Sequence, residues 1–354
     1  MYKKIYVPVD NSEHSHCASD IAVMLGKKFG ATLVGSHVYA AQLHDYRFRQ
    51  MESGLPDRYR EEGRLDQQRQ AHGSLIATGL KLISDSYLDV VERKCEEAGL
   101  RFERKIFDGR HYRVLAEDIQ RSDCDLVAIG ALGMGAVKES LIGSVCERVV
   151  RRITTDALIV KSQSPLNGTA GAIVVAIDGS RRSFAGLKIA LGLAKVFERS
   201  VEAVAVYDPY LHHALFKGMV KVLSEQAAKV FRFATQERLH EEIIDKGLAK
   251  IYQSHLERAA NVADEDGVDL KVKLLTGKAF EKILHYVHEA EPWLLVLGRC
   301  GMHSPEEDEA DLGSNAENLL RLAPCHVYLC GRVLSLPDVK AKPFHGEFQS
   351  KEAP

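Results

Sequence analysis

The feature that most constrains the fold of this chain is an internal repeat. The segment from Ile5 to Ser12 matches the segment from Ile173 to Ser180, 168 positions later, and both read as an apolar run followed by Asp-x-Ser. The same offset pairs further landmarks: Tyr39 with Tyr207, Gly109 with Gly277, Gly130 with Gly298, and Gly133 with Gly301. A fixed spacing held over so many positions indicates duplication. The chain is therefore expected to fold as two copies of one domain.

Each copy alternates short apolar runs with segments of helical periodicity. In copy one, strands are predicted at 4–9, 32–39, 101–107, 125–130 and 157–161, and helices at 15–29, 76–95, 111–122 and 145–152. A long polar stretch separates the second strand from the second helix. Strands that alternate with helices favour a parallel sheet covered on both faces by right-handed crossovers. The predicted fold class is α/β, with two tandem open parallel-sheet, Rossmann-like domains that form a pseudo-dimer.

The repeat also sets the expected domain bounds. The 354 residues are enough for two domains. We place them at 1–161 and 172–333, with a linker at 162–171 rich in turn-forming residues and a C-terminal extension at 334–354. The final strands of the two copies, 157–161 and 327–330, would each leave a sheet edge unpaired, so we expect them to pair with one another within the chain. A further homodimer remains open.

Composition excludes several classes of partner. The net charge of −2 gives no basic field for nucleic acid, and no run approaches the roughly 18 apolar residues of a membrane helix. Seven cysteines without framework spacing suggest reduced thiols and a cytoplasmic protein. The protein is thus expected to bind neither nucleic acid nor membranes.

The loops that follow the first and fourth strands carry the candidate site. Ligands of open parallel sheets bind beyond the carboxyl ends of the strands, where the strand order reverses. The second loop is rich in glycine, which lets the backbone approach a ligand or take positive φ, and it runs into a helix start that would present N–H donors to an anion. Ser144 at that start could cap the helix and donate to a phosphate oxygen. The candidate residues of the two loops are Asp10, Ser12, Gly130, Gly133, Gly143 and Ser144.

Other familiar sites are absent from the sequence. It has no G-x-x-x-x-G-K-[ST] loop and no G-x-G-x-x-G after the first strand. Lys138 is the obvious cation of the glycine loop and Glu139 its acid, but no set of nucleophile, base and orienting group stands out, so no catalytic residue is assigned. The run His14-x-His16-Cys17 lacks a distant partner ligand, and no metal site is assigned either.

The spacing Gly130-x2-Gly133-x9-Gly143-Ser144 resembles the ATP-binding signature of the universal stress protein family. The resemblance covers residues 1–161 and 172–333, and it extends to the opening strand, Val7 to Ser12. It implies that Asp10 bonds the adenine, that backbone around Val38 lines the adenine pocket, and that the glycines and Ser144 hold the phosphates. By itself, Asp10 could equally cap the helix that follows it.

The resemblance favours a regulatory module in the stress response that binds ATP, with or without Mg²⁺, and an unidentified protein partner. Alternatives from other classes are a slow ATPase or nucleotidyl transferase using the same pocket, a structural pseudo-dimer without ligand, and a flavin-binding relative.

Copy two departs from the signature. The spacing from Gly301 to Gly313 is two residues longer than that from Gly133 to Gly143, and the intervening loop contains five carboxylates and no lysine or arginine. Such a loop should repel phosphates unless Mg²⁺ bridges them. Nucleotide binding is therefore expected mainly in copy one.

Overall fold

The computed structural model describes residues 1–54, 56, 62–137, 140–161, 171–209, 246–302 and 312–334. Lys138 and Glu139, most of the predicted linker, the acidic loop of copy two and nearly all of the C-terminal extension lie outside the described residues. The chain divides into two compact units. One consists of Met1–Ala170 with Ser304–Arg332, and the other of Gly171–His303 with Val333–Pro354.

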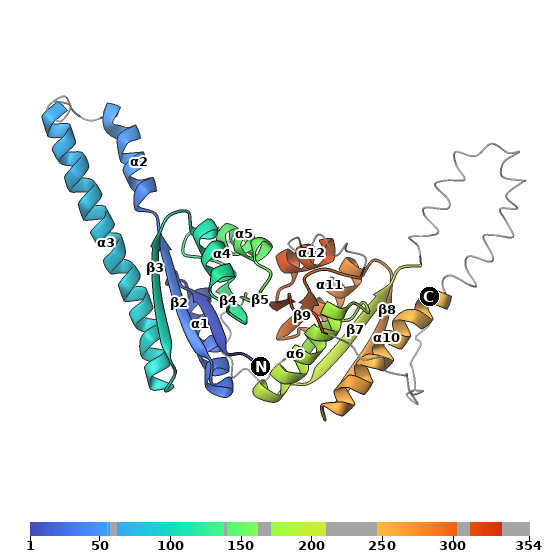
Figure 1. Ribbon diagram of the computed structural model, residues 1–354. Coiled ribbons are helices and arrows are strands. Elements are labelled where there is room, and N and C mark those ends of the chain that lie inside the picture. Colours follow the sequence, from blue (N-terminus) through green and yellow to red (C-terminus); the bar gives the residue numbers. More distant parts are fainter. Residues whose placement is uncertain are drawn as a thin grey trace, which may run out of the picture. The chain divides into compact units, whose positions relative to one another are not determined.

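Copy one follows the alternating order expected from the sequence (Figure 1). Its elements are β1 (Lys4–Pro8), α1 (Glu13–Phe29), β2 (Thr32–Tyr39), α2 (Ala41–Met51), η1 (Glu52–Gly54), α3 (Glu62–Glu97), β3 (Phe102–Asp108), α4 (His111–Arg121), β4 (Leu126–Gly130), α5 (Ser144–Arg152) and β5 (Asp156–Val160).

Copy two repeats this order within its described residues. Its elements are β6 (Ile173–Ala176), α6 (Arg181–Phe197), β7 (Val201–Tyr207), α10 (Lys246–Glu265), β8 (Leu270–Thr276), α11 (Ala279–Ala290), β9 (Leu294–Gly298), α12 (Ser314–Leu322) and β10 (His326–Cys330).

The first unit has the strand order β3-β2-β1-β4-β5-β10, and pairing from β3 to β5 is parallel throughout. The chain places β2 and β3 on one side of β1 before crossing to β4 on the other, so the strand order reverses between β1 and β4. The second unit has the order β9-β6-β7-β8, also parallel, with the same reversal next to β6. The α/β fold class is confirmed.

The final strands of the two copies pair as expected. Strand β10 lies antiparallel to β5, with Tyr328 opposite Leu158. The helices that precede these strands add reciprocal ion pairs: Arg321 of α12 donates to Glu147 of α5 at 2.6 Å, and Arg151 of α5 donates to Glu317 of α12. Since α12 and β10 belong to copy two, the first unit contains the last elements of both copies.

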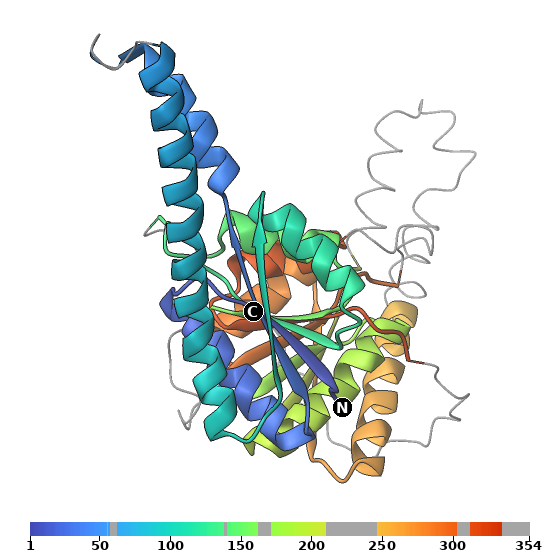
Figure 2. The same cartoon turned by 60° about the vertical axis from the view of Figure 1, so that its left-hand side comes forward.

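The polar stretch after β2 is helical, which periodicity did not predict. Figures 1 and 2 show α2 and α3 side by side, extending beyond the end of the sheet of the first unit. The contacts of α3 with α2 and with η1 are aromatic and polar. The rings of Phe48 in α2 and His72 in α3 stack with centroids 4.3 Å apart, and the Arg69 guanidinium of α3 lies 2.7 Å from the Glu52 carboxylate of η1. Such contacts need no apolar stripe. For this reason the periodicity predicted a helix only at 76–95 and did not show the first half of α3.

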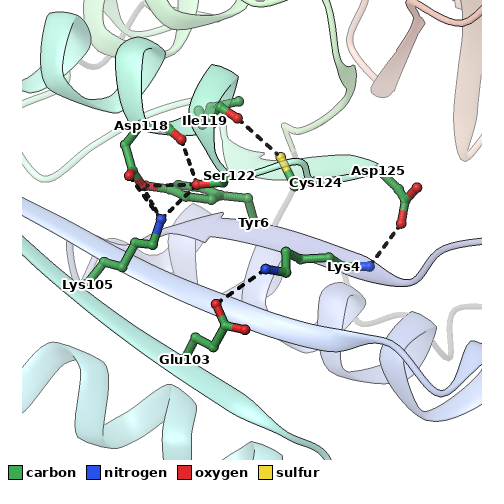
Figure 3. A network of polar contacts seen from close by, with 9 residues as sticks. All are labelled: Lys4, Tyr6, Glu103, Lys105, Asp118, Ile119, Ser122, Cys124 and Asp125. Carbon is green, nitrogen blue, oxygen red and sulfur yellow. Dashed lines mark hydrogen bonds and ion pairs between the residues drawn. The ribbon is translucent and has the colours of Figure 1, made fainter.

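A polar network fixes α4 against the sheet (Figure 3). The Tyr6 hydroxyl of β1 donates to Asp118 at 2.6 Å, and the Lys105 ammonium of β3 donates to Asp118 and Ser122 at 2.9 and 2.7 Å. Tyr6 is fully buried, so its hydroxyl requires this partner. Anchoring the C-terminal half of α4 in this way also sets the position of its first residue, His111.

Candidate functional site

A pocket of about 580 Å³ opens at the carboxyl ends of β1, β2 and β4, where the strand order reverses. Its walls come from the loop after β1, the end of β2, the glycine loop after β4 and the first residues of α5, with α2, α3 and α4 closing the sides. Six of the seven residues predicted from the sequence line it: Asp10, Val38, Gly130, Gly133, Gly143 and Ser144. The seventh, Ser12, does not.

Ser12 instead holds Asp10 and begins the helix. Its hydroxyl accepts from the Ser15 N–H as the N-cap of α1, and it lies 2.6 Å from Asp10 Oδ1, to which it donates. The Ser12 N–H donates to the same oxygen at 3.1 Å. Asp10 is therefore not the helix cap, and both bonds fall on one of its carboxylate oxygens. The other oxygen, Oδ2, has no hydrogen-bond donor among the described residues.

Gly130 and Gly133 are glycines because neighbouring atoms lie too close for a side chain, and not because of their backbone dihedral angles. Neither Gly130 nor Gly133 has a positive φ, so the expectation that these positions need glycine for a left-handed backbone is wrong. A Cβ on Gly133 would lie 2.5 Å from Asp10 Oδ2, and one on Gly130 would lie 2.8 Å from the backbone of His14 and Ser15. Both contacts are too short for a side chain. Gly130 lets the end of β4 pack directly on the first turn of α1, and Gly133 lets the loop after β4 pack on Asp10.

The start of α5 forms the second half of the site. The Gly143 N–H donates to the Ala131 carbonyl at 2.7 Å and closes the loop, and Gly143 is itself the N-cap. Ser144 is thus the first helical residue, not the cap that the sequence suggested. Because Gly143 has no side chain, the first N–H groups of α5 are left to a ligand, at the positive end of the helix dipole.

The charge of the pocket is low. Burial raises the pKa of the Cys146 thiol to about 12, so the start of α5 carries no thiolate at neutral pH. Among the described residues that line the pocket there is no lysine or arginine, and Asp10 is the acidic one. Backbone N–H groups are therefore the main anion donors that the described part of the site offers.

The sequence prediction missed the side walls. His37 of β2, Tyr87 of α3 and His111 of α4 all line the pocket, together with apolar side chains of α2 and α3. The His37 and Tyr87 rings meet edge to face with centroids 5.2 Å apart. Burial and the neighbouring His37 lower the pKa of His111, and Asp10 opposes the shift. A histidine inside the apolar run 32–39 was the available signal for one of these residues.

The matching positions of copy two differ in two ways. Asp178, the counterpart of Asp10, accepts from Ser180 N through Oδ1 and from Met302 N, at 2.9 Å, through Oδ2, so that both of its carboxylate oxygens are bonded. Gly179 has φ +90°, and a Cβ there would lie 2.4 Å from the ring of His255. His255 stands where copy one has Tyr87, and its ring packs directly against the loop after β6.

Comparison with known proteins agrees with the two-copy organisation. The profile of the universal stress protein family matches residues 1–161 and again 170–331. A universal stress protein of Methanocaldococcus jannaschii is 28% identical over 163 residues, which are 46% of this chain and 83% of that protein. One of Bacillus subtilis is 25% identical over 161 residues, 46% of this chain and all of that protein.

A solved structure shares the fold over nearly the whole length. The crystal structure of a universal stress protein from Archaeoglobus fulgidus has a TM-score of 0.54 with this chain at 17% identity, and the match covers 92% of this chain and 97% of the other. Within the described residues, no helix is both long and apolar enough to cross a membrane. Cys17, Cys95, Cys124 and Cys146 form no disulfide bond.

Proposed function

This chain belongs to the universal stress protein family, and we propose from that membership that copy one is an ATP-binding regulatory module of the stress response. The observation that carries the proposal is the convergence of Asp10, Val38, the glycine loop and the start of α5 on one pocket. These residues come from three separate parts of the sequence, and they meet at the place where open parallel sheets bind ligands.

The pocket suits a nucleotide in size and in the distribution of polar groups. Its volume of about 580 Å³ falls within the range of about 300–1,000 Å³ that small-molecule sites occupy. One end offers the free Asp10 oxygen and the end of β2, which suit a base, and the other offers N–H donors at a helix start, which suit phosphates. Mg²⁺ and Lys138 are the candidates to balance the remaining phosphate charge.

A bound nucleotide would regulate the protein by changing its conformation or its affinity for a protein partner. Leu43 and His44 of α2 and Leu80, Ile83 and Tyr87 of α3 line the pocket. A nucleotide would contact this helical pair directly and favour the arrangement of α2 and α3 that fits it.

Titration calorimetry with ATP and Mg²⁺ tests the proposal, with Asp10→Ala and its repeat counterpart Asp178→Ala as the matched pair. Loss of a bond to a charged acceptor should weaken binding by about 1–3 kcal/mol in Asp10→Ala, whereas Asp178→Ala should leave the affinity of copy one unchanged. Equal effects of the two substitutions, or no binding by the unmodified chain, would contradict the proposal. Recovery of intact ATP after incubation separates a binding module from a slow ATPase.

A further inference from the structure

The wall of the copy-one pocket contains an acceptor that the family signature does not include. We propose that His37 is a specificity-determining residue, whose Nε2 accepts a hydrogen bond from the 6-amino group of a bound purine and so excludes 6-oxo purines. The inference rests on the proposed function, because it concerns which base the same pocket selects.

The structure fixes the protonation pattern of the neutral His37 ring. Its Nδ1 lies within hydrogen-bond distance of the Val9 carbonyl. A carbonyl oxygen can only accept, so Nδ1 carries the proton and Nε2 is left with a lone pair. The edge-to-face contact with Tyr87 holds the ring from a second side. Among the described residues, Nε2 has no hydrogen-bond partner, and His37 is one of the residues that line the pocket.

A second bare acceptor lies in the same pocket. Asp10 Oδ2 is left without a donor because both bonds from Ser12 fall on Oδ1. His37 and Asp10 flank the loop after β1, since His37 bonds the carbonyl of the residue that directly precedes Asp10. Two acceptors at this end of the pocket require a ligand that presents N–H donors to them.

Purine bases differ in just this property. Adenine carries a 6-amino group that donates, whereas guanine and hypoxanthine carry a 6-oxo group that accepts. A 6-oxo oxygen placed against His37 Nε2 and Asp10 Oδ2 would bring three acceptors together without a donor. A binding site discriminates strongly against a ligand that leaves its polar groups unpaired in this way.

The repeat supplies an internal contrast. At the position of His37, copy two has Ala205, which is fully buried, and at the position of Asp10 it has Asp178 with both oxygens bonded. Both free acceptors of copy one are thus absent from the matching positions of copy two. His37→Ala gives copy one the residue that copy two has at the matching position, so the substitution should be compatible with the fold.

The test compares ATP with inosine triphosphate, in which a 6-oxo group replaces the 6-amino group. Calorimetry at fixed Mg²⁺ gives the ratio of the two dissociation constants for the unmodified chain, His37→Ala, His37→Phe and His44→Ala. His37→Phe keeps a ring against Tyr87 without its nitrogens. His44 also lines the pocket but is exposed on α2, which makes it the matched control.

The unmodified chain should prefer ATP, and both His37 variants should narrow that preference by about threefold to tenfold, the equivalent of one neutral hydrogen bond. His44→Ala should change both affinities by the same factor. An unchanged ratio in the folded His37 variants, or equal narrowing in His44→Ala, would overturn the assignment while leaving ATP binding intact. Failure of the unmodified chain to bind ATP would instead refute the proposed function.

Discussion

Removal of the Asp156 carboxylate should loosen β10, the final strand of copy two, from β5 within the first unit. Asp156 begins β5, and its side chain is 1% exposed. Its Oδ2 accepts from the Tyr328 hydroxyl of β10 at 2.7 Å and from Arg332 Nε at 2.6 Å, and its Oδ1 accepts from the Gly331 N–H at 2.8 Å. The Tyr328 hydroxyl also bonds that of Tyr2 at 3.0 Å.

The expected cost follows from what Asp156→Ala leaves behind. Breaking a buried ion pair by removing one partner costs about 3–5 kcal/mol, because the other charge stays buried and unpaired. Arg332 is 38% exposed, so water can solvate part of its guanidinium, and the loss should fall near the lower end, at about 3 kcal/mol. Asp156→Asn keeps the shape of the side chain and one acceptor oxygen, and it should lower the free energy of unfolding by about 1–3 kcal/mol.

Urea denaturation followed by circular dichroism measures the loss, and hydrogen exchange of the β10 amides locates it. Glu103→Ala is the control, because Glu103 is 47% exposed and pairs with Lys4 at 3.5 Å, a surface pair worth about 0–1 kcal/mol. A loss below about 1 kcal/mol in Asp156→Ala, or unchanged protection of the β10 amides, would show that the Asp156 carboxylate does not hold β10 in place.

Two other predictions concern the site and its support. Burial lowers the pKa of Lys161 to about 8 from its ordinary 10.5, so the folded chain binds fewer protons than the unfolded chain between these values, and stability should rise with pH across that window. Denaturation of Lys161→Met at pH 7.5 and 10 should show a smaller rise than the unmodified chain, and an equal rise would contradict the shift. Gly133→Val should abolish ATP binding, because its Cβ would lie 2.5 Å from the Asp10 carboxylate, whereas Gly301→Val should not. Equal losses in ATP stoichiometry would show that copy one does not dominate.

Much of the fold could be predicted because it depends on pattern. The apolar runs that became β1 and β4 are buried on both faces, which is the condition under which a strand reads as continuous hydrophobic sequence. The repeat located the matching strands of copy two, and the unpaired sheet edges of the two final strands indicated the pairing of β5 with β10. Convergence of the two loops followed from the strand order, since neighbouring parallel strands end at the same edge of a sheet.

The remaining features depend on contacts that a pattern does not encode. The first half of α3 packs on α2 through His72 and on η1 through Arg69, rather than through an apolar stripe. Close approach to Asp10, not positive φ, requires Gly133. Ser12 supports the Asp10 carboxylate instead of lining the pocket, because its hydroxyl caps α1 and bonds Oδ1. Each of these distinctions needs the position of a neighbour from elsewhere in the chain.

The proposed function requires the copy-one pocket to hold an adenine nucleotide. The most direct measurement is mass identification of any nucleotide released when freshly purified chain is denatured, performed alongside Gly133→Val. The unmodified chain should release an adenine nucleotide and the variant should release none, because a Cβ at this position would collide with Asp10. Release of no nucleotide, of a flavin, or of equal amounts of nucleotide from both proteins would contradict it.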